Sequence, residues 1–241
     1  MGVSIAICEL DSDSALCKVG KTKLLKVNLK DISGFKDVAE FDIVVPLSQA
    51  KLLMGDDWEA FLKRNRLDPD METLYLDKIK NQADGDLLVA ESQKLYTGWI
   101  PLDKVPGERM SALMDKAGMD DRLTAWDMLS LEEMGATCAK CPLSWDEGRG
   151  CMGTFGPENS ALLDIARRHN SSIVASIPES VASKRAFSVE EAAQLLGEVK
   201  LLREKLPEEG KVMVRRYSGV LDRLEKMGNV CVIHRTRFYF L

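Results

Sequence analysis

The sequence predicts an α+β protein, and three observations support this fold class. The chain has 241 residues, 45% of them hydrophobic, which can fill a sizeable core without disulfides. β-favourable segments gather in residues 1–46, whereas apolar stripes with helical spacing dominate after residue 101. We therefore expect an N-terminal antiparallel β meander, followed by a mainly helical part that contains a cysteine-rich metal loop, and a C-terminal strand.

The predicted meander has four strands. Residues 3–10 and 15–20 are β-favourable arms around a turn at residues 11–14, where Asp and Ser alternate. Residues 24–29 and 38–45 continue the β pattern, and the second of these segments alternates apolar and polar side chains in part, as a half-buried strand does.

This hairpin would bring two cysteines together. With a four-residue turn, Cys8 faces Cys17, and opposed Cβ atoms lie about 4.5–5.5 Å apart. Three interpretations stay open: two small apolar residues buried on one sheet face, ligands that join a metal site, or a redox pair.

The later part of the chain is expected to be mostly helical. The predicted helices cover residues 48–65, 107–117, 121–134, 157–169, 189–206 and 213–227. The helix over 121–134 ends just before Cys138, which would place that cysteine at a helix end, and Pro157 would begin the next helix. Residues 172–177 read as a buried strand, and residues 230–240 as a C-terminal strand that joins an earlier sheet.

A β-rich part over residues 1–100 and a mainly helical part over residues 101–241 follow from this distribution, although the two could form one domain. The net charge is −5, and the basic residues of 184–241 are diluted by acids, so we expect no nucleic-acid partner. No apolar run approaches the roughly 20 residues of a membrane span, and the first residues lack a basic leader, so we expect a cytoplasmic protein that does not enter a membrane.

The strongest chemical signal lies in residues 136–157. This loop holds Cys138, Cys141 and Cys151 in the spacing Cys-x2-Cys-x9-Cys, together with four glycines and two prolines. Cysteines separated by two residues can direct both sulfurs to one point, and a third can approach on a glycine-rich loop. In a reducing compartment this pattern indicates metal binding or catalysis rather than disulfides.

The three cysteines are one ligand short of a four-thiolate site. His169 is a poor fourth ligand, because a helix over 158–169 would carry it about 16–18 Å away along the axis. Cys17 or Cys8 are the first candidates, and Cys231 or His234 come next. Otherwise the position is open to water, substrate or a partner.

An iron–sulfur cluster, of the [4Fe–4S] type, is our first metal hypothesis, and zinc is the alternative. Pro142 follows Cys141, as in the Cys-Pro that ends bacterial ferredoxin runs, whereas zinc knuckles favour glycine there. The loop glycines can offer N–H groups to cluster sulfides; they are Gly148, Gly150, Gly153 and Gly156. Nearby apolar side chains can exclude water from the cluster; they are Trp145, Met152 and Phe155.

Two rival interpretations use the same loop. The glycines at 148, 150 and 153 match a dinucleotide fingerprint formally, but they do not follow a predicted strand. A catalytic thiolate at Cys151 would need a lowered pKa, for which the positive end of a helix beginning at Gly156 could serve. The chain has only two histidines, neither near Cys151 in sequence, which argues against a Cys–His pair.

Three functions follow as hypotheses. The first is a protein that holds one iron–sulfur cluster and acts in electron transfer or as a component of a redox or cofactor-handling assembly, with a protein partner. The second is a non-catalytic interaction module with structural zinc. The third is an enzyme that uses an open metal position as a Lewis acid.

Overall fold

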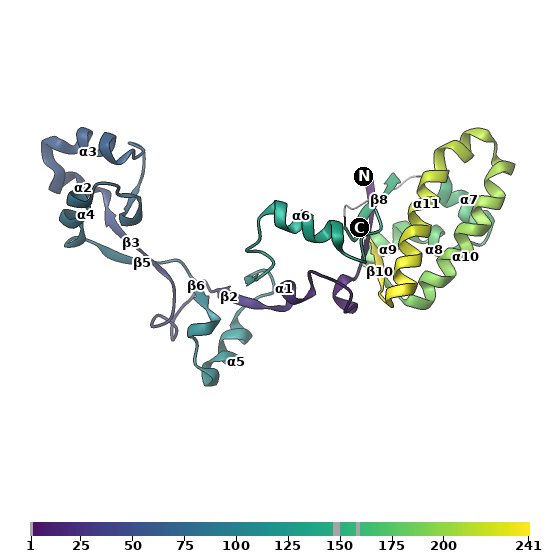
Figure 1. The fold of residues 1–241 in the computed structure, drawn as a ribbon, viewed down its shortest axis with the longest axis horizontal. Helices are drawn as coiled ribbons and strands as arrows, with labels where there is room; N and C mark the ends of the chain where they lie inside the picture. Colours follow the sequence, from purple (N-terminus) through teal and green to yellow (C-terminus); the bar gives the residue numbers. More distant parts are fainter. Residues whose placement is uncertain (1, 147–149, 158–159) are drawn as a thin grey trace. The chain divides into compact units, whose positions relative to one another are not determined.

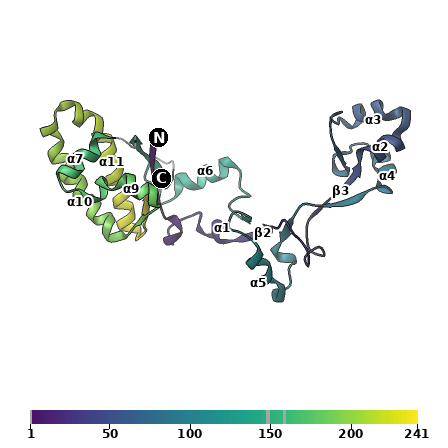
Figure 2. The ribbon, with the colours of Figure 1, turned by 180° about the vertical axis from the view of Figure 1, so that it is seen from behind.

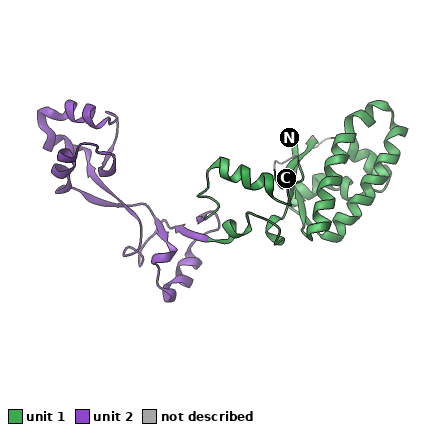
Figure 3. Cartoon of the chain, in the orientation of Figure 1, with its two compact units in different colours: residues 1–23, 125–241 green, residues 24–124 purple. Residues whose placement is uncertain are grey.

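The computed structural model describes residues 2–146, 150–157 and 160–241. The chain forms two compact units (Figure 3). Unit 1 comprises residues 1–23 and 125–241, and unit 2 comprises residues 24–124, which are inserted between the two segments of unit 1. This division differs from the predicted boundary near residue 100. Helices and several antiparallel sheets are both present, in agreement with the predicted α+β class.

The sheet of unit 1 joins segments from the whole length of the chain. Its strands are β1 (Gly2–Ile7), β8 (Met152–Pro157), β9 (Ala186–Phe187) and β10 (Phe238–Phe240), in the order β8-β1-β10-β9. The C-terminal strand therefore joins an early strand, as predicted, with Ile5 opposite Phe240. It is shorter than predicted, because the chain stays helical up to His234.

The predicted N-terminal meander is wrong. Strands β1, β2 (Leu24–Asn28) and β3 (Phe41–Pro46) lie in three different sheets. Strand β1 has β8 and β10 as its neighbours, so the chain after Cys8 turns away into the 3-10 helix η1 (Glu9–Asp11) and the short helix α1 (Lys18–Thr22). Consequently Cys8 and Cys17 do not face each other across a hairpin.

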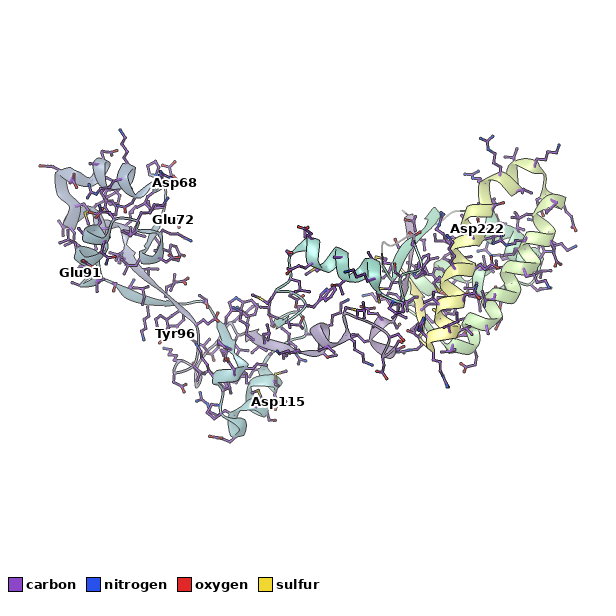
Figure 4. The ribbon with its side chains drawn as sticks, in the orientation of Figure 1. Asp68, Glu72, Glu91, Tyr96, Asp115 and Asp222 are labelled. Carbon is purple, nitrogen blue, oxygen red and sulfur yellow. The ribbon has the colours of Figure 1, made fainter. Side chains whose placement is uncertain are left out.

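Besides α1, unit 1 contains α6 (Leu131–Lys140), α7 (Ala161–Arg168), α8 (Ser172–Ala175), α9 (Ile177–Ser183), α10 (Val189–Lys205), η5 (Leu206–Glu209) and α11 (Lys211–His234). The helices from α7 onward pack against one another, and α9 and α11 also contact the sheet. Helices α10 and α11 lie side by side in both views (Figures 1 and 2). Asp222 of α11, labelled in Figure 4, forms an ion pair with Arg203 of α10, with 2.7 Å between the Arg203 Nη2 and Asp222 Oδ1 atoms. Leu195, Leu221 and Phe238 lie fully buried between these elements.

Local capping explains three differences from the predicted elements. Ser130 and Glu133 form a capping box that begins α6 at Leu131, so the predicted helix over 121–134 is wrong. The segment 172–177 is helical rather than a strand, because the buried Glu198 carboxylate accepts hydrogen bonds from the N–H groups at the start of α8. Ser160 caps α7, which therefore begins after β8 and not at Pro157.

Unit 2 contains two small sheets with their own helices. One sheet has the order β6-β2-β7, with β6 at Trp99–Pro101 and β7 at Arg122–Thr124; the other has the order β4-β3-β5, with β4 at Thr73–Tyr75 and β5 at Gln93–Tyr96. The helices are α2 (Leu47–Met54), η2 (Gly55–Asp57), α3 (Trp58–Asn65), η3 (Leu76–Lys78), α4 (Gln82–Val89), η4 (Leu102–Lys104) and α5 (Gly107–Lys116). The predicted helix over 48–65 is interrupted at Gly55, which has a positive φ of 51°.

Each sheet of unit 2 has a separate apolar cluster. Tyr96 of β5, labelled in Figure 4, meets Phe41 of β3 edge-on, with ring centroids 5.9 Å apart. Asp84 of α4 is buried and receives hydrogen bonds from Arg64 and Asn65 of α3, each at 2.6 Å. Among the helices of the described residues, none has the length and apolar character needed to cross a membrane.

Candidate metal centre

The three loop cysteines lie where a helix ends and a strand begins. Cys138 belongs to the last turn of α6, Cys141 is the C-cap residue of that helix, and Cys151 directly precedes β8. The N–H of Cys141 donates to the carbonyl oxygen of Cys138 at 3.1 Å, which closes the turn between them. The helix thus carries the first cysteine, in contrast to the prediction that it would end before it.

Cys17 comes from the other segment of unit 1. It is the N-cap residue of α1 and is 7% exposed. Two backbone hydrogen bonds fasten α1 to the segment that leads into α6: the N–H of Ala125 donates to Lys23 at 2.8 Å, and that of Trp126 donates to Gly20 at 3.2 Å. These bonds hold Cys17 beside the cysteines of the loop, although more than 100 residues separate them in sequence.

Four cysteines line one small cavity in unit 1. The cavity measures about 20 Å³, and its lining consists of Cys17, Cys138, Cys141 and Cys151 together with Glu9, Thr137 and Gly150. Leu143 and Ala15 are buried beside Cys17, and Trp126 packs against this cluster. The structure therefore brings together the predicted trio and one of the two cysteines that we expected as the first candidates for a fourth ligand.

The sulfurs surround the cavity without converging on a common centre. In the part of the chain that the structure describes, no three His, Cys, Asp or Glu side chains lie close enough to hold one metal ion. All six cysteines are free thiols. The arrangement is a small cavity lined by four cysteines.

Glycine is required at one position of the lining. Gly150 has a φ of 102°, a conformation that residues with a side chain rarely adopt. A Cβ atom at this position would also lie 3.7 Å from Cys138 Sγ. The N–H of Gly150 donates to Ser144 Oγ at 3.1 Å, so it does not offer the hydrogen bond to a cluster sulfide that we expected.

Burial opposes ionisation of the Cys17 and Cys151 thiols, whose pKa values it raises. Burial and, to a smaller extent, the Glu9 carboxylate raise the pKa of Cys151 to about 11, although Lys21 opposes the rise. Burial also raises the pKa of Cys17, and Lys21 again opposes it. The strand β8, rather than the predicted helix, follows Cys151, so the helix end that this hypothesis required is not present there. The catalytic-thiolate hypothesis therefore gains no support.

The remaining candidate ligands lie elsewhere in the fold. Cys8 does not belong to the cavity lining; its N–H and carbonyl groups bond to Arg237 and Thr236. Cys231 is fully buried in α11 and contacts Met227 Sδ at 3.4 Å. His234 Nδ1 lies 3.1 Å from Ser14 Oγ. His169 is the C-cap residue of α7, the helix-end position expected for it.

Of the other loop residues singled out in the sequence, some lie as predicted and some do not. Trp145 is buried and its Nε1–H donates to the carbonyl oxygen of Cys151 at 3.0 Å, while Phe155 packs in the main core. Met152 is 51% exposed, so it does not exclude water as expected. Gly148, the first glycine of the formal dinucleotide fingerprint, lies outside the described residues. Gly153, the last glycine of that pattern, lies in β8, where it pairs with Ile5 of β1, and no helix begins there.

Sequence reasoning missed two polar side chains at the cavity. Glu9 belongs to the lining, and Lys21 forms an ion pair with it. No sequence motif signals these residues, because their proximity depends on how residues 8–23 turn away from the sheet. Comparison of the chain with protein-family models, with curated proteins and with solved structures finds no match.

Proposed function

We propose that this protein holds one iron–sulfur cluster through Cys17, Cys138, Cys141 and Cys151, and that it acts in electron transfer or as a component of a redox or cofactor-handling assembly. One observation carries the proposal: four cysteines from two distant segments of the chain line the same cavity. Four thiolates are the usual ligands of [2Fe–2S] and [4Fe–4S] clusters. A set of four soft sulfur donors is also typical of zinc.

The surroundings of the cavity favour a cluster. Ala15, Leu143 and Trp126 form an apolar shell beside the cysteines, and exclusion of water is one of the means by which proteins tune cluster potentials. Four sulfur donors complete a coordination shell by themselves. The hypothesis of an open Lewis-acid position therefore has no support from the donor set.

The size of the cavity favours the alternative, a structural zinc site in an interaction module. A cavity of about 20 Å³ holds roughly one water-sized sphere, which suits a single ion better than a cluster of several atoms. A cluster would require the loop and α1 to move apart, whereas zinc would require only rotation of the thiol side chains. The identity of the metal is therefore the first quantity to measure.

Exposed apolar side chains beside the cysteines support a protein partner. Leu16 directly precedes Cys17 and is 51% exposed, and Val19, two residues after Cys17, is 75% exposed. Met152, which follows Cys151, is exposed as well. Exposed apolar groups around a redox or metal centre are suited to a partner surface. Docking of a protein at this end of α1 would bring it close to the proposed centre.

The experiment is anaerobic purification followed by measurement of iron, acid-labile sulfide and zinc per chain, with a visible absorption spectrum. Iron and sulfide with a broad visible band support the cluster, and one zinc per chain without colour supports the alternative. Cys141→Ser and Cys17→Ser should both lose the metal, because each removes a thiolate. Cys8→Ser is the matched control and should retain it, since Cys8 is outside the cavity lining. Equal retention in Cys17→Ser and Cys8→Ser would contradict the four-cysteine site.

A further inference from the structure

A half-buried ion pair lies at the edge of the cysteine cavity. The Glu9 carboxylate belongs to the cavity lining, and Lys21 Nζ pairs with its Oε1. Both side chains are largely covered, with exposed fractions of 19% for Glu9 and 32% for Lys21. The pair thus sits in surroundings where charges are screened less than on an open surface.

The position of Lys21 is fixed by the same helix that presents Cys17. Its backbone N–H donates to the carbonyl oxygen of Cys17 at 2.9 Å. Its ammonium lies 5.7 Å from the centroid of the Trp126 ring, and Trp126 packs against the cysteine cluster. Lys21 also interacts electrostatically with Cys17 and Cys151. One cation therefore lies within electrostatic range of two of the four cysteines.

A positive charge at this place has a definite effect on a thiolate centre. Binding of a divalent ion by four cysteines converts four neutral thiols to thiolates and releases their protons, which leaves a site of net charge −2. A neighbouring cation stabilises that charge, and a neighbouring carboxylate destabilises it. Glu9 and Lys21 are therefore expected to act with opposite signs.

We propose that Lys21 is a positioning residue of the metal centre: its ammonium balances the charge of the thiolates and holds the Glu9 carboxylate in an ion pair, out of the metal coordination. This inference rests on the proposed four-cysteine site and deepens it. It assigns Glu9 no ligand role, although Glu9 borders the cavity. It also explains why a carboxylate is tolerated beside four thiols.

The test is titration of reduced, metal-free protein with Co²⁺ alone, followed by the sulfur-to-metal charge-transfer absorption. Cobalt binds thiolate sites of the zinc type, so the readout does not depend on the native metal. Lys21→Met should weaken Co²⁺ binding by about tenfold, the order expected for loss of one partly screened charge. Glu9→Gln should strengthen binding, and Lys21→Arg should retain the affinity of the unmodified protein.

Lys18→Met is the matched control, because Lys18 lies on the same helix but pairs with the exposed Asp13. It should leave the affinity unchanged. A merely structural role of Lys21 would weaken binding in Glu9→Gln as well as in Lys21→Met, because both break the ion pair, and this result would overturn the inference. Weaker binding in Glu9→Gln alone would identify Glu9 as a ligand and would overturn it too.

The same titration separates this inference from the proposed function. If the unmodified protein binds no Co²⁺, the four-cysteine site fails and the inference fails with it. If the unmodified protein binds Co²⁺ and Lys21→Met binds it equally well, the site stands and the role of Lys21 is wrong. Circular dichroism of each variant establishes that the fold is retained.

Discussion

The two units of this protein differ in where their cysteines and charges lie. All six cysteines belong to unit 1, which has 19 Lys+Arg and 19 Asp+Glu; unit 2 has no cysteine and carries 14 Lys+Arg against 19 Asp+Glu. The whole net charge of −5 is thus located in unit 2. Thiol chemistry is confined to one unit, and the inserted unit is held by apolar clusters and ion pairs.

The candidate centre is assembled from segments on both sides of an inserted unit. Unit 2 lies between Cys17 and Cys138 in sequence, yet the residues on either side of it, Lys23 and Ala125, are joined by a hydrogen bond of 2.8 Å. The chain leaves and re-enters unit 1 at the same place. We therefore expect the cysteine cavity to form without residues 24–124.

The largest expected difference between the units concerns metal removal. A ligand that binds only the folded state at 1,000 times its Kd stabilises that state by about 4.1 kcal/mol. Treatment of the loaded protein with a chelator should therefore increase hydrogen exchange in α1, α6 and β8. Exchange in α3 and α4 should not change. Equal loosening of both units would show that the metal does not belong to unit 1 alone.

The opposite pattern is expected when the buried carboxylate of an ion pair in unit 2 is removed. Asp84→Ala removes the buried carboxylate that Arg64 and Asn65 share, while Asp57 and the Phe61 carbonyl oxygen remain as acceptors for them. The substitution should destabilise unit 2 by about 1–3 kcal/mol. Urea unfolding followed at unit 2 measures this change, and metal content should stay constant. Asp86→Asn, at an exposed position of the same helix, is the matched control. Surface substitutions usually change the free energy of unfolding by no more than about 0.5 kcal/mol. A decrease for Asp84→Ala within that range would contradict the structural role of the pair.

The same pair predicts how unit 2 responds to acid. Hydrogen bonds from Arg64, aided by Asn65, lower the pKa of Asp84 below its ordinary value. A carboxylate whose pKa is lowered in the folded state stabilises that state above the unfolded pKa, and the contribution is lost as the pH falls through the folded pKa. Asp84→Asn should therefore make the stability of unit 2 less dependent on pH in the acid range. An unchanged acid profile would contradict the assignment.

A smaller effect is expected at the cavity glycine. Gly150→Ala forces a side chain into a positive-φ conformation next to Cys138, at a cost of about 1–3 kcal/mol, and should weaken metal binding. Gly135→Ala, on the same helix as Cys138 and with open space around its Cα, should instead leave the site intact and stabilise α6 by about 0.5–1 kcal/mol. Isothermal titration with the metal measures the difference. Equal affinities would show that the backbone at Gly150 does not shape the cavity.

The smallest effect is expected from excision of unit 2. A variant in which a short Gly-Ser linker replaces residues 24–124 should hold the metal with the stoichiometry of the full chain, because the ends of the insertion already meet. Loss of the metal from this variant, with unit 1 still folded by circular dichroism, would show that unit 2 contributes to the site.

The parts of the fold that depend on local signals could be predicted from the sequence. The capping box of Ser188 and Glu191 begins α10 as expected, because all its contacts lie within three residues. The meander failed because β1 pairs with strands more than 140 residues away, at Gly153 and Phe240 for example. Sequence proximity favoured a hairpin, whereas distant pairing determined the sheet.

The candidate site shows the same limit. The spacing of Cys138, Cys141 and Cys151 identified the loop, since two of these residues are near neighbours on one helix end. Cys17 was expected beside Cys8 in a hairpin, but it reaches the cavity through α1 and its bonds to the segment before α6. The absence of cysteine from residues 24–124 was the signal that could have linked the two flanking segments. Glu9 had no such signal.

X-ray absorption at the metal edge of anaerobically purified protein tests the central claim most directly. We expect about four sulfur ligands near 2.3 Å. Additional iron scattering would establish the cluster, and a lone zinc ion would establish the alternative. A first shell made of nitrogen or oxygen, or protein that contains no metal, would contradict the claim that these four cysteines form a metal centre.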